Sequence, residues 1–521
     1  MKLQLKDTFN KELPADKETK NTRRQVFDAC FSFVEPRVPS DPSMIHTSVE
    51  MAEALGISSE EVKSKEFLEI FSGSKLIEGS QPYAMCYGGH QFGHWAGQLG
   101  DGRAINIGEI VHDDQRWAMQ LKGSGETPYS RSADGLAVLR SSIREHLCSE
   151  AMYHLGAPTT RSLSLCLTGD QVLRDVMYDG NPAYEKGAVV CRVAPTFIRF
   201  GNFQILASRK DTKTLKALAD YTIKYFFPEI TTDSKEKYIE FFNQVVDKTL
   251  NMVIHWQRVG FVHGVMNTDN MSITGMTIDY GPYGWLEDFD HGWTPNTTDR
   301  TDKRYRFGNQ PSIAQWNLFQ LANALYPLIE DAKPLEAALK RYAEEFHPKY
   351  LKMMTSKLGL SEVKPDDESL VERLEKLLSL AETDMTIFFR ELANVSKEDS
   401  PENAIEKISL AFYDKEVAEN NYFNQWKHWF NSYLERLQEE VNLDLSRREM
   451  MRSVNPKYVL RNYMAQLAID AADKGDYSVV DELYQMLKNP YTEQPEYDKW
   501  YAKRPDWARH KVGCSMLSCS S

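Results

Sequence analysis

The order of the predicted elements favours an α+β fold with two lobes. Strand-like segments gather around one long helix between about residues 103 and 194, and from about residue 211 onward the pattern is mostly helical. Strands followed by a run of helices are typical of α+β architecture, in which sheet and helices are segregated. With 521 residues, the chain is long enough for two or three domains or for one elaborated domain.

We predict four regions in chain order. They are an N-terminal helical extension (1–80), a first lobe with the strands (81–205), a second lobe (206–330) and a largely helical C-terminal region with a cysteine-containing tail (331–521). Residues 43–72 are predicted to be helical, because SSEEVKSKEF has the sequence of a capped helix start. Residues 79–103 are rich in glycine, histidine and aromatics, which is typical of loops.

The elements of the first lobe follow from periodicity. RAINIGEIV and RWAMQLK are predicted strands, and DGLAVLRSSIREHLCSEAMYHLG has the apolar spacing of a helix with a glycine at its end. RSLSLCLT, QVLRDVM and GAVVCRVA are three further strand candidates. In the second lobe, MSITGMTIDYG suggests a short hairpin with a glycine turn, and residues 311–488 carry several amphipathic helices.

Composition narrows the class of protein. The net charge of -13 and the pI near 5.5 argue against general affinity for nucleic acid or an anionic membrane. No apolar run approaches the length of a membrane span, and the N-terminus lacks the apolar core of a signal peptide. Five of the seven cysteines stand singly among apolar neighbours, as small core residues do. We therefore expect a cytoplasmic protein. We also expect it to be a monomer.

The stretch HGVMNTDNMSITGMTIDYGP, residues 263–282, nearly matches the catalytic core of a kinase. Kinases carry His-Arg-Asp or His-Gly-Asp, then four residues, then Asn, then a hairpin that ends in Asp-Phe-Gly. His263, Asn270 and Asp279 fit this pattern, whereas Val265 stands where the kinase base would be. An isopropyl group cannot accept a proton, but Asp269 lies immediately before Asn270 and could serve as a displaced base.

Three further pieces lie upstream in kinase order. GQLGDGRA, with Gly100, Gly102 and Arg103, is a glycine-rich turn that could cradle phosphates, although such clusters are usually only turns. Lys122 ends the next predicted strand, and Glu145 lies on the following helix, where it could pair with Lys122. A solvated surface pair is the alternative for these two residues, but the kinase order of all the pieces argues against coincidence.

Metal and phosphate ligands can be assigned from charge. Asn270 and Asp279 would supply the oxygen ligands that Mg²⁺ or Mn²⁺ prefers, and we expect Asp279 to be a ligand at the surface of the site; an Asx-turn is the alternative for it. Arg192 and Arg199 lie in an otherwise apolar segment, and their forked donors suit phosphate oxygens. Salt bridges to acids of this acidic chain are the alternative for the arginines.

These motifs resemble the selenoprotein O family, protein adenylyltransferases with a bilobal, protein-kinase-like (pseudokinase) fold. The matching stretches are YGGHQFGHWAGQLGDGRA, QLKGSGETPYSRSADGLAVLRSSIREHL, VCRVAPTFIRFGNF, HGVMNTDNMSITGMTIDYGPYGWLEDF and the terminal CSS; apart from the tail they span residues 80 to 300. The resemblance implies transfer of AMP from ATP to Ser, Thr or Tyr hydroxyls of protein substrates, with redox-related proteins as candidate partners. Pyrophosphate would be released.

The resemblance also implies roles for individual residues. Nucleotide contacts would come from Gly100, Gly102, Arg103, Lys122, Asp134, Gly135, Arg192, Arg199 and Asp279. Asp269 would accept the proton, Asn270 and Asp279 would hold the metal, and Glu145 would orient Lys122. An atypical kinase that uses Asp269, and a nucleotide-binding pseudokinase scaffold without activity, are the competing interpretations.

The C-terminal tail GCSMLSCSS departs from the family pattern. Members with a redox tail pair its last cysteine with a cysteine after the Asp-x-Gly motif, but GPYGWLEDFDHGWTPNTTDR contains none. We expect Cys514 and Cys519 to be exposed thiols on a mobile terminus, and any redox disulfide there to join these two residues. An inert tail is the alternative.

Overall fold

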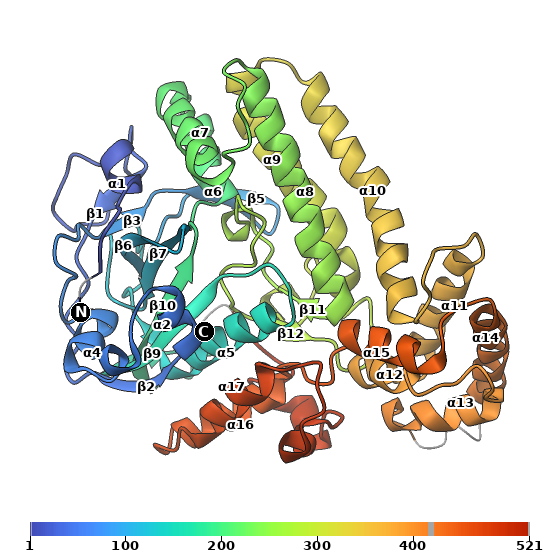
Figure 1. The fold of residues 1–521 in the computed structure, drawn as a ribbon. Coiled ribbons are helices and arrows are strands. Elements are labelled where there is room, and N and C mark those ends of the chain that lie inside the picture. Colours follow the sequence, from blue (N-terminus) through green and yellow to red (C-terminus); the bar gives the residue numbers. More distant parts are fainter. Residues whose placement is uncertain (2, 415–420, 519–521) are drawn as a thin grey trace.

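The computed structural model describes residues 1, 3–414 and 421–518. Its first part is an antiparallel sheet and its second part is helical, with the sheet and the far helical end at opposite sides of the molecule (Figure 1). The predicted mixed fold with a helical C-terminal region is therefore confirmed at this level. The four region boundaries stay predictions.

Eight strands form the main sheet. Along its path they are β1 (Phe31–Phe33), β3 (Tyr83–Met85), β6 (Ala104–His112), β7 (Gln115–Lys122), β10 (Ala183–Ala194), β9 (Arg161–Arg174) and β2 (Ser43–Thr47), while β8 (Ala137–Val138) pairs with β10. The central pairing of β7 with β10 places Lys122 opposite Val190 and Arg192 opposite Gln120. The sheet register thus brings two predicted site residues onto adjacent strands.

The structure corrects two predictions near the N-terminus. Residues 43–47 form β2 rather than helix, because they pair with β9 from Ser43 opposite Leu167 to Thr47 opposite Ser164. The predicted helices begin only afterwards, as α2 (Val49–Ala54), α3 (Ser59–Val62) and α4 (Lys65–Ser72). The predicted capped start is confirmed, since Ser58 and Glu61 form a capping box. The expected loop at 79–103 holds β3 and the small hairpin of β4 (Gly88–Gln91) and β5 (His94–Gln98).

The central strands and helix match their predicted positions. RAINIGEIV and RWAMQLK become β6 and β7, and the predicted helix becomes α5 (Leu139–His154), which Gly156 follows with φ 74°. The two strand candidates at 161–177 merge into the single strand β9. The hairpin predicted at 271–281 is present in its shortest form, as one antiparallel bridge between Met271 and Thr277 with Gly275 in the left-handed region.

The helical part begins directly after β10. Its helices are α6 (Phe200–Ser208), α7 (Thr212–Phe226), α8 (Glu236–Val259), α9 (Gln310–Ile329), α10 (Lys333–Lys357), α11 (Asp367–Leu380), α12 (Met385–Leu392), α13 (Pro401–Ile408), α14 (Asn421–Gln438), α15 (Asp444–Val454), α16 (Asn462–Ala472) and α17 (Ser478–Leu487). The long helices α8, α9 and α10 pack against one another, and α16 and α17 return to pack on α5 (Figure 1). The end of the chain is thereby tied to the sheet-bearing part.

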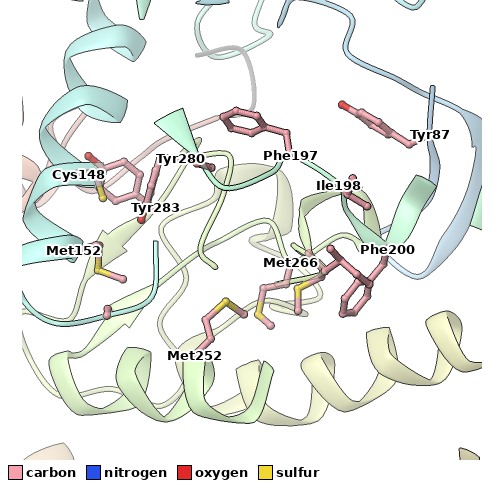
Figure 2. Close-up of a cluster of buried hydrophobic side chains, with 14 of the residues drawn as sticks. Tyr87, Cys148, Met152, Phe197, Ile198, Phe200, Met252, Met266, Tyr280 and Tyr283 are labelled. Atoms are coloured by element: carbon pink, nitrogen blue, oxygen red, sulfur yellow. The ribbon is translucent and has the colours of Figure 1, made fainter. Parts of the chain in front are cut away.

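A buried cluster joins the sheet to the helices beneath the predicted catalytic loop (Figure 2). Its labelled members come from the segment between β3 and β4, from the segment after β10 and the start of α6, from α5, from α8 and from the predicted catalytic motifs: Tyr87, Cys148, Met152, Phe197, Ile198, Phe200, Met252, Met266, Tyr280 and Tyr283. All ten are buried. Close packing of this kind leaves little room for movement, so it holds the loop at a defined position relative to the sheet.

Among the described residues, every helix is too short or too polar to cross a membrane.

Candidate active site

The expected pair between Lys122 and Glu145 is present. Lys122 ends β7, Glu145 lies in the second turn of α5, and the lysine Nζ is 2.6 Å from the glutamate Oε2. Burial lowers the pKa of Lys122, while the nearby Glu145 carboxylate opposes that shift. Because Glu145 is only 2% exposed, this is a buried pair rather than the solvated surface pair considered above.

Asp279 lies between two arginines. Its Oδ1 accepts a hydrogen bond from Arg192 and its Oδ2 accepts one from Arg199. Burial alone would raise the pKa of Asp279, but Arg199, Arg192 and Lys122 hold it well below its usual range. Its backbone has φ 59°, a conformation that aspartate adopts more readily than most residues.

Arg192 links the two acidic groups. Its Nη1 is 3.1 Å from the Glu145 Oε1 and also donates to Asp279. Lys122, Glu145, Arg192, Asp279 and Arg199 thus form one chain of alternating charges, here called the site network. Buried charges require such pairing, because an isolated charge away from water is strongly unfavourable. The salt-bridge interpretation of the arginines is confirmed, and the acid they share is the predicted metal ligand; phosphate binding by the arginines stays a prediction.

Asp279 is more enclosed than expected for a ligand at the surface of the site, and its role as a ligand stays a prediction. Its side chain is 21% exposed, and both of its oxygens already bind guanidinium groups that are 1–3% exposed. The carboxylate therefore also holds the interior together. The sequence left salt bridges of the two arginines as an alternative but did not identify Asp279 as their shared partner, because the arginines come from the end of β10 and from the segment that follows it.

Asp269 lies on the predicted catalytic loop, in a short 3₁₀ turn at Thr268–Asn270. Its Oδ2 accepts a hydrogen bond from Gln91 Nε2 at 3.3 Å, and its buried Oδ1 has no hydrogen-bond partner. Burial raises the pKa of Asp269 to about 6. Gly89 borders this carboxylate, and a Cβ added there would lie 2.6 Å from Oδ1. A carboxylate that has an unpaired oxygen and a raised pKa has the properties expected of a general base.

The predicted catalytic loop is connected to the site network through its backbone. Arg199 Nη1 donates to the Asp269 carbonyl oxygen at 2.8 Å, and Asn270 Nδ2 donates to the Val265 carbonyl oxygen at 2.9 Å. The Asn270 amide is thus oriented by the residue that replaces the kinase base. The loop and the arginines therefore share one rigid arrangement.

Four predicted nucleotide contacts have other partners in this structure. Asp134 is paired with Arg174, with oxygen–nitrogen distances of 2.7 and 2.9 Å. Gly135 has φ 72°, and a Cβ there would overlap the backbone of Gly125. Gly100 and Gly102 pack against Tyr129, and a Cβ on Gly100 would overlap its ring. These glycines are required by close packing, whatever further contacts they make.

Arg103, by contrast, belongs to the same electrostatic environment as the site network. Burial lowers its pKa, while Glu145 and Asp279 raise it and Arg192 lowers it further. Its backbone carbonyl accepts a hydrogen bond from the Gly123 N–H at 2.7 Å, which fixes the start of β6 beside the end of β7.

Sequence reasoning missed two buried polar residues of the site. Asp101 is 2% exposed and lies 3.9 Å from Arg199. Gln120 donates to Asp101 at 3.2 Å and accepts a hydrogen bond from Arg192. The sequence contained a clue to both residues. Asp101 stands between Gly100 and Gly102, and Gln120 lies two residues before Lys122, on the same face of the strand.

The tail also differs from its prediction. Cys514 is 4% exposed, and burial raises the pKa of its thiol to about 11. Asn462 Nδ2 donates to the Cys514 carbonyl oxygen at 2.8 Å, and Leu517 bonds to Thr297. Cys514 is therefore not an exposed, reactive thiol. Cys519, and with it the predicted pairing, lies outside the described residues.

The donor set fits a nucleotide with a divalent cation. The Asp279 and Asn270 side-chain oxygens are hard ligands of the kind that Mg²⁺ and Mn²⁺ take. An ionised carboxylate has about four lone-pair sites, so Asp279 could bind a cation without releasing its arginines. Lys122, Arg192 and Arg199 supply the positive charge that phosphate groups need.

Comparison with known proteins identifies the family of this chain. Residues 17–488 match the family model described as "Protein adenylyltransferase SelO". A protein named protein nucleotidyltransferase YdiU from Flavobacterium johnsoniae is 62% identical over 519 residues, which cover 100% of this chain and 99% of that protein. Proteins of the same name from Rhodopirellula baltica and Aromatoleum aromaticum are each 54% identical, with at least 98% of both chains covered. The chain therefore belongs to the SelO family of protein adenylyltransferases.

Proposed function

We propose that this protein transfers AMP from ATP to Ser, Thr or Tyr hydroxyls of target proteins and releases pyrophosphate. Membership of the SelO family supports this, as do relatives named nucleotidyltransferases. One observation carries the proposal in this chain: Val265 occupies the position of the kinase base, while the next carboxylate on the loop, Asp269, has an orphaned buried oxygen. The proton acceptor has moved along the loop, so the hydroxyl approaches a different phosphorus.

The proposed architecture is a two-lobed, kinase-like fold that binds the nucleotide in the reverse orientation. The chain order supports it: a strand lysine, its helix glutamate, a catalytic loop with Asn270 and an Asp-Tyr-Gly motif. Lys122, Arg192 and Arg199 would neutralise the β- and γ-phosphates, with Arg103 nearby, which leaves the α-phosphorus open to attack. Gly100, Gly102, Asp134 and Gly135 stay proposed nucleotide contacts.

Asn270 and Asp279 would hold Mg²⁺ or Mn²⁺, which would supply charge neutralisation at the phosphates. Asp269 would accept the proton of the incoming hydroxyl at its orphaned Oδ1, in a buried setting where its pKa of about 6 leaves it ionised at neutral pH. Gln91 and the backbone contact from Arg199 would keep that carboxylate in place. Glu145 would orient Lys122 and limit its movement.

The cytoplasmic location, the monomeric state and redox-related proteins as partners stay predictions. The strongest competing function is an atypical kinase that uses Asp269, which the Lys122–Glu145 pair favours because active kinases carry the same pair.

The deciding experiment uses ATP labelled at either the α- or the γ-phosphate. We expect the α-label to become covalently attached to protein in the presence of Mg²⁺ or Mn²⁺, and the γ-label to leave with pyrophosphate. Asp269→Ala is the control, and it should reduce labelling by about 10²–10⁴ while ATP binding persists. Transfer of the γ-label alone would establish a kinase instead, and labelling by neither would leave a nucleotide-binding scaffold.

A further inference from the structure

A second charged pocket lies in the helical C-terminal region, between α12, α15 and the segment after α17. Its volume is about 390 Å³, within the range of small-molecule sites. Four cations line it: Arg390, Arg448, Arg452 and Lys457. None of the residues assigned to the candidate active site takes part in its wall.

The wall carries more positive than negative charge. Its two carboxylates are Glu391 and Glu493, so the cations outnumber the acids by two. Such an excess is unusual in a chain with a net charge of -13. Like charges gathered around a cavity repel one another, and an anion in the cavity would relieve that repulsion.

The two carboxylates are already occupied. Glu493 lies 2.7 Å from Arg390 Nη2, 2.7 Å from Lys457 Nζ and 3.5 Å from Arg452 Nη1. Burial would raise the pKa of Glu493, but Lys457 and Arg390 lower it to about 2. Glu391 accepts hydrogen bonds from Tyr501 and Asn394. Glu493 is thus shared by three cations, Lys457 also pairs with Asp498 at 2.7 Å, and no carboxylate of the wall is left to neutralise Arg448.

The arginines of the wall keep unused donors. Arg390 is 3% exposed, yet its Nε has no hydrogen-bond partner, and the buried Nε atoms of Arg448 and Arg452 also have none. Across the described residues, Arg448 forms no ion pair. Burial lowers the pKa of Arg452, and the neighbouring Arg448 and Arg390 lower it further. Buried donors without partners are unfavourable, so the hydrogen-bonding capacity of this arginine cluster is not fully used within the protein.

We propose that this pocket binds a small phosphate-type dianion, either inorganic phosphate or the phosphate group of a small phosphomonoester. Guanidinium groups present forked donors that match phosphate oxygens in pairs. Arg448, which forms no ion pair within the described residues, would donate through its guanidinium group, and Arg390, Arg452 and Lys457 would add positive charge. The room in the pocket permits a small organic group beside the phosphate.

Binding is tested on the full chain by calorimetric titration with inorganic phosphate and with glycerol 3-phosphate, with chloride added to hold ionic strength constant. We expect saturable binding of one anion per chain, weakened at least tenfold in the double variant Arg448→Gln/Arg452→Gln. Glu391→Gln should strengthen binding, because it removes a negative charge from the wall. Lys340→Gln, an exposed cation on α10, is the matched control and should bind like the wild type. Tighter binding of glycerol 3-phosphate would identify the phosphomonoester as the ligand, and equal affinities would identify phosphate itself.

Two results would overturn the proposal. One is the absence of saturable binding at about 10 mM of either anion. The other is binding that disappears in Lys122→Gln but survives in the double variant, since the anion would then occupy the candidate active site. Circular dichroism of each variant establishes that it is folded, and Arg448→Gln should keep the native fold because, within the described residues, it breaks no ion pair.

Discussion

At the scale of single residues, two aspartates of the candidate site have opposite electrostatic surroundings. Asp269 is buried with one oxygen unpaired, and its pKa is raised from the ordinary 3.8 to about 6. Asp279 is held between Arg192 and Arg199, and its pKa is lowered. Two carboxylates whose pKa values differ in this way can take different roles, one as a proton acceptor and the other as a permanent anion.

Asp269→Asn should stabilise the protein while it removes activity. The folded state binds the Asp269 proton more tightly than the unfolded chain does, so this group lowers stability as pH rises from about 4 to about 6. Removing the charge should raise the free energy of unfolding at pH 7.5 by on the order of 1–3 kcal/mol and leave it nearly unchanged near pH 4. Urea denaturation at both pH values measures this. Asp233→Asn, at a fully exposed aspartate, is the control and should have little effect. A destabilised Asp269→Asn at pH 7.5 would contradict the burial argument.

Asp279→Asn should destabilise the protein at neutral pH. With a neutral amide at position 279, the remaining acidic partner of Arg199 is Asp101, at 3.9 Å. The remaining acidic partner of Arg192 is Glu145. We expect a loss of about 2–4 kcal/mol, somewhat below the value for fully buried pairs because Asp279 keeps some contact with solvent. The lowered pKa means that this stabilisation is present at neutral pH and lost only as pH falls below about 4.

Asp134→Asn provides the matched comparison for Asp279→Asn. It also breaks an aspartate–arginine pair, but its carboxylate is 42% exposed, so the loss should stay below about 1 kcal/mol. Urea denaturation of both variants at pH 7 gives the difference. Equal stabilities would mean that the site network contributes no more than a surface pair.

At the scale of elements, the turns around the sheet are determined by backbone packing. The loop from β7 to α5 folds back so that Gly125 N–H bonds to the Gly135 carbonyl at 3.1 Å, and Gly135 has φ 72°. Any side chain at Gly135 would meet the Gly125 backbone, which cannot move aside as a flexible side chain could. The glycine therefore fixes where the loop closes beside Lys122.

Gly135→Ala should be considerably more disruptive than Gly180→Ala. Both glycines have positive φ, but Gly180 has no neighbouring atom within 4 Å of an added Cβ. Gly180→Ala should lose about 1–2 kcal/mol from backbone strain alone. Gly135→Ala should lose a further 1–3 kcal/mol or so, because the methyl group also forces a backbone shift. Thermal and urea denaturation of the two variants measure the difference, and equal losses would rule out the overlap.

At the scale of the whole molecule, the C-terminal region closes back onto the sheet-bearing part. α16 and α17 pack on α5, and Leu517 bonds to Thr297 in the segment after the Asp-Tyr-Gly motif. The tail is thus part of the fold at least to residue 518, and Cys514 is buried within it.

Thiol alkylation should follow global unfolding at every described cysteine. All six, Cys30, Cys86, Cys148, Cys166, Cys191 and Cys514, are buried, and burial raises their pKa values. A buried thiol with a raised pKa carries little thiolate and reacts slowly. Mass spectrometry after iodoacetamide treatment of native and urea-unfolded protein should find these six sites modified only in the unfolded sample. Modification of Cys514 at the rate of a free peptide would show that the tail detaches in solution.

The sequence by itself determined the family, the order of the catalytic pieces and the Lys122–Glu145 pair, because each depends on residue types at short, recognisable spacings. Periodicity likewise located β6, β7 and α5, whose hydrogen bonds and apolar faces repeat locally. Only the tertiary structure decided that β2 is a strand, that Asp279 is shared by Arg192 and Arg199, that Asp101 and Gln120 complete the site and that Cys514 is buried. The physical reason is that strand pairing, burial and the choice of ionic partner depend on which distant segments meet, and no local pattern specifies those meetings.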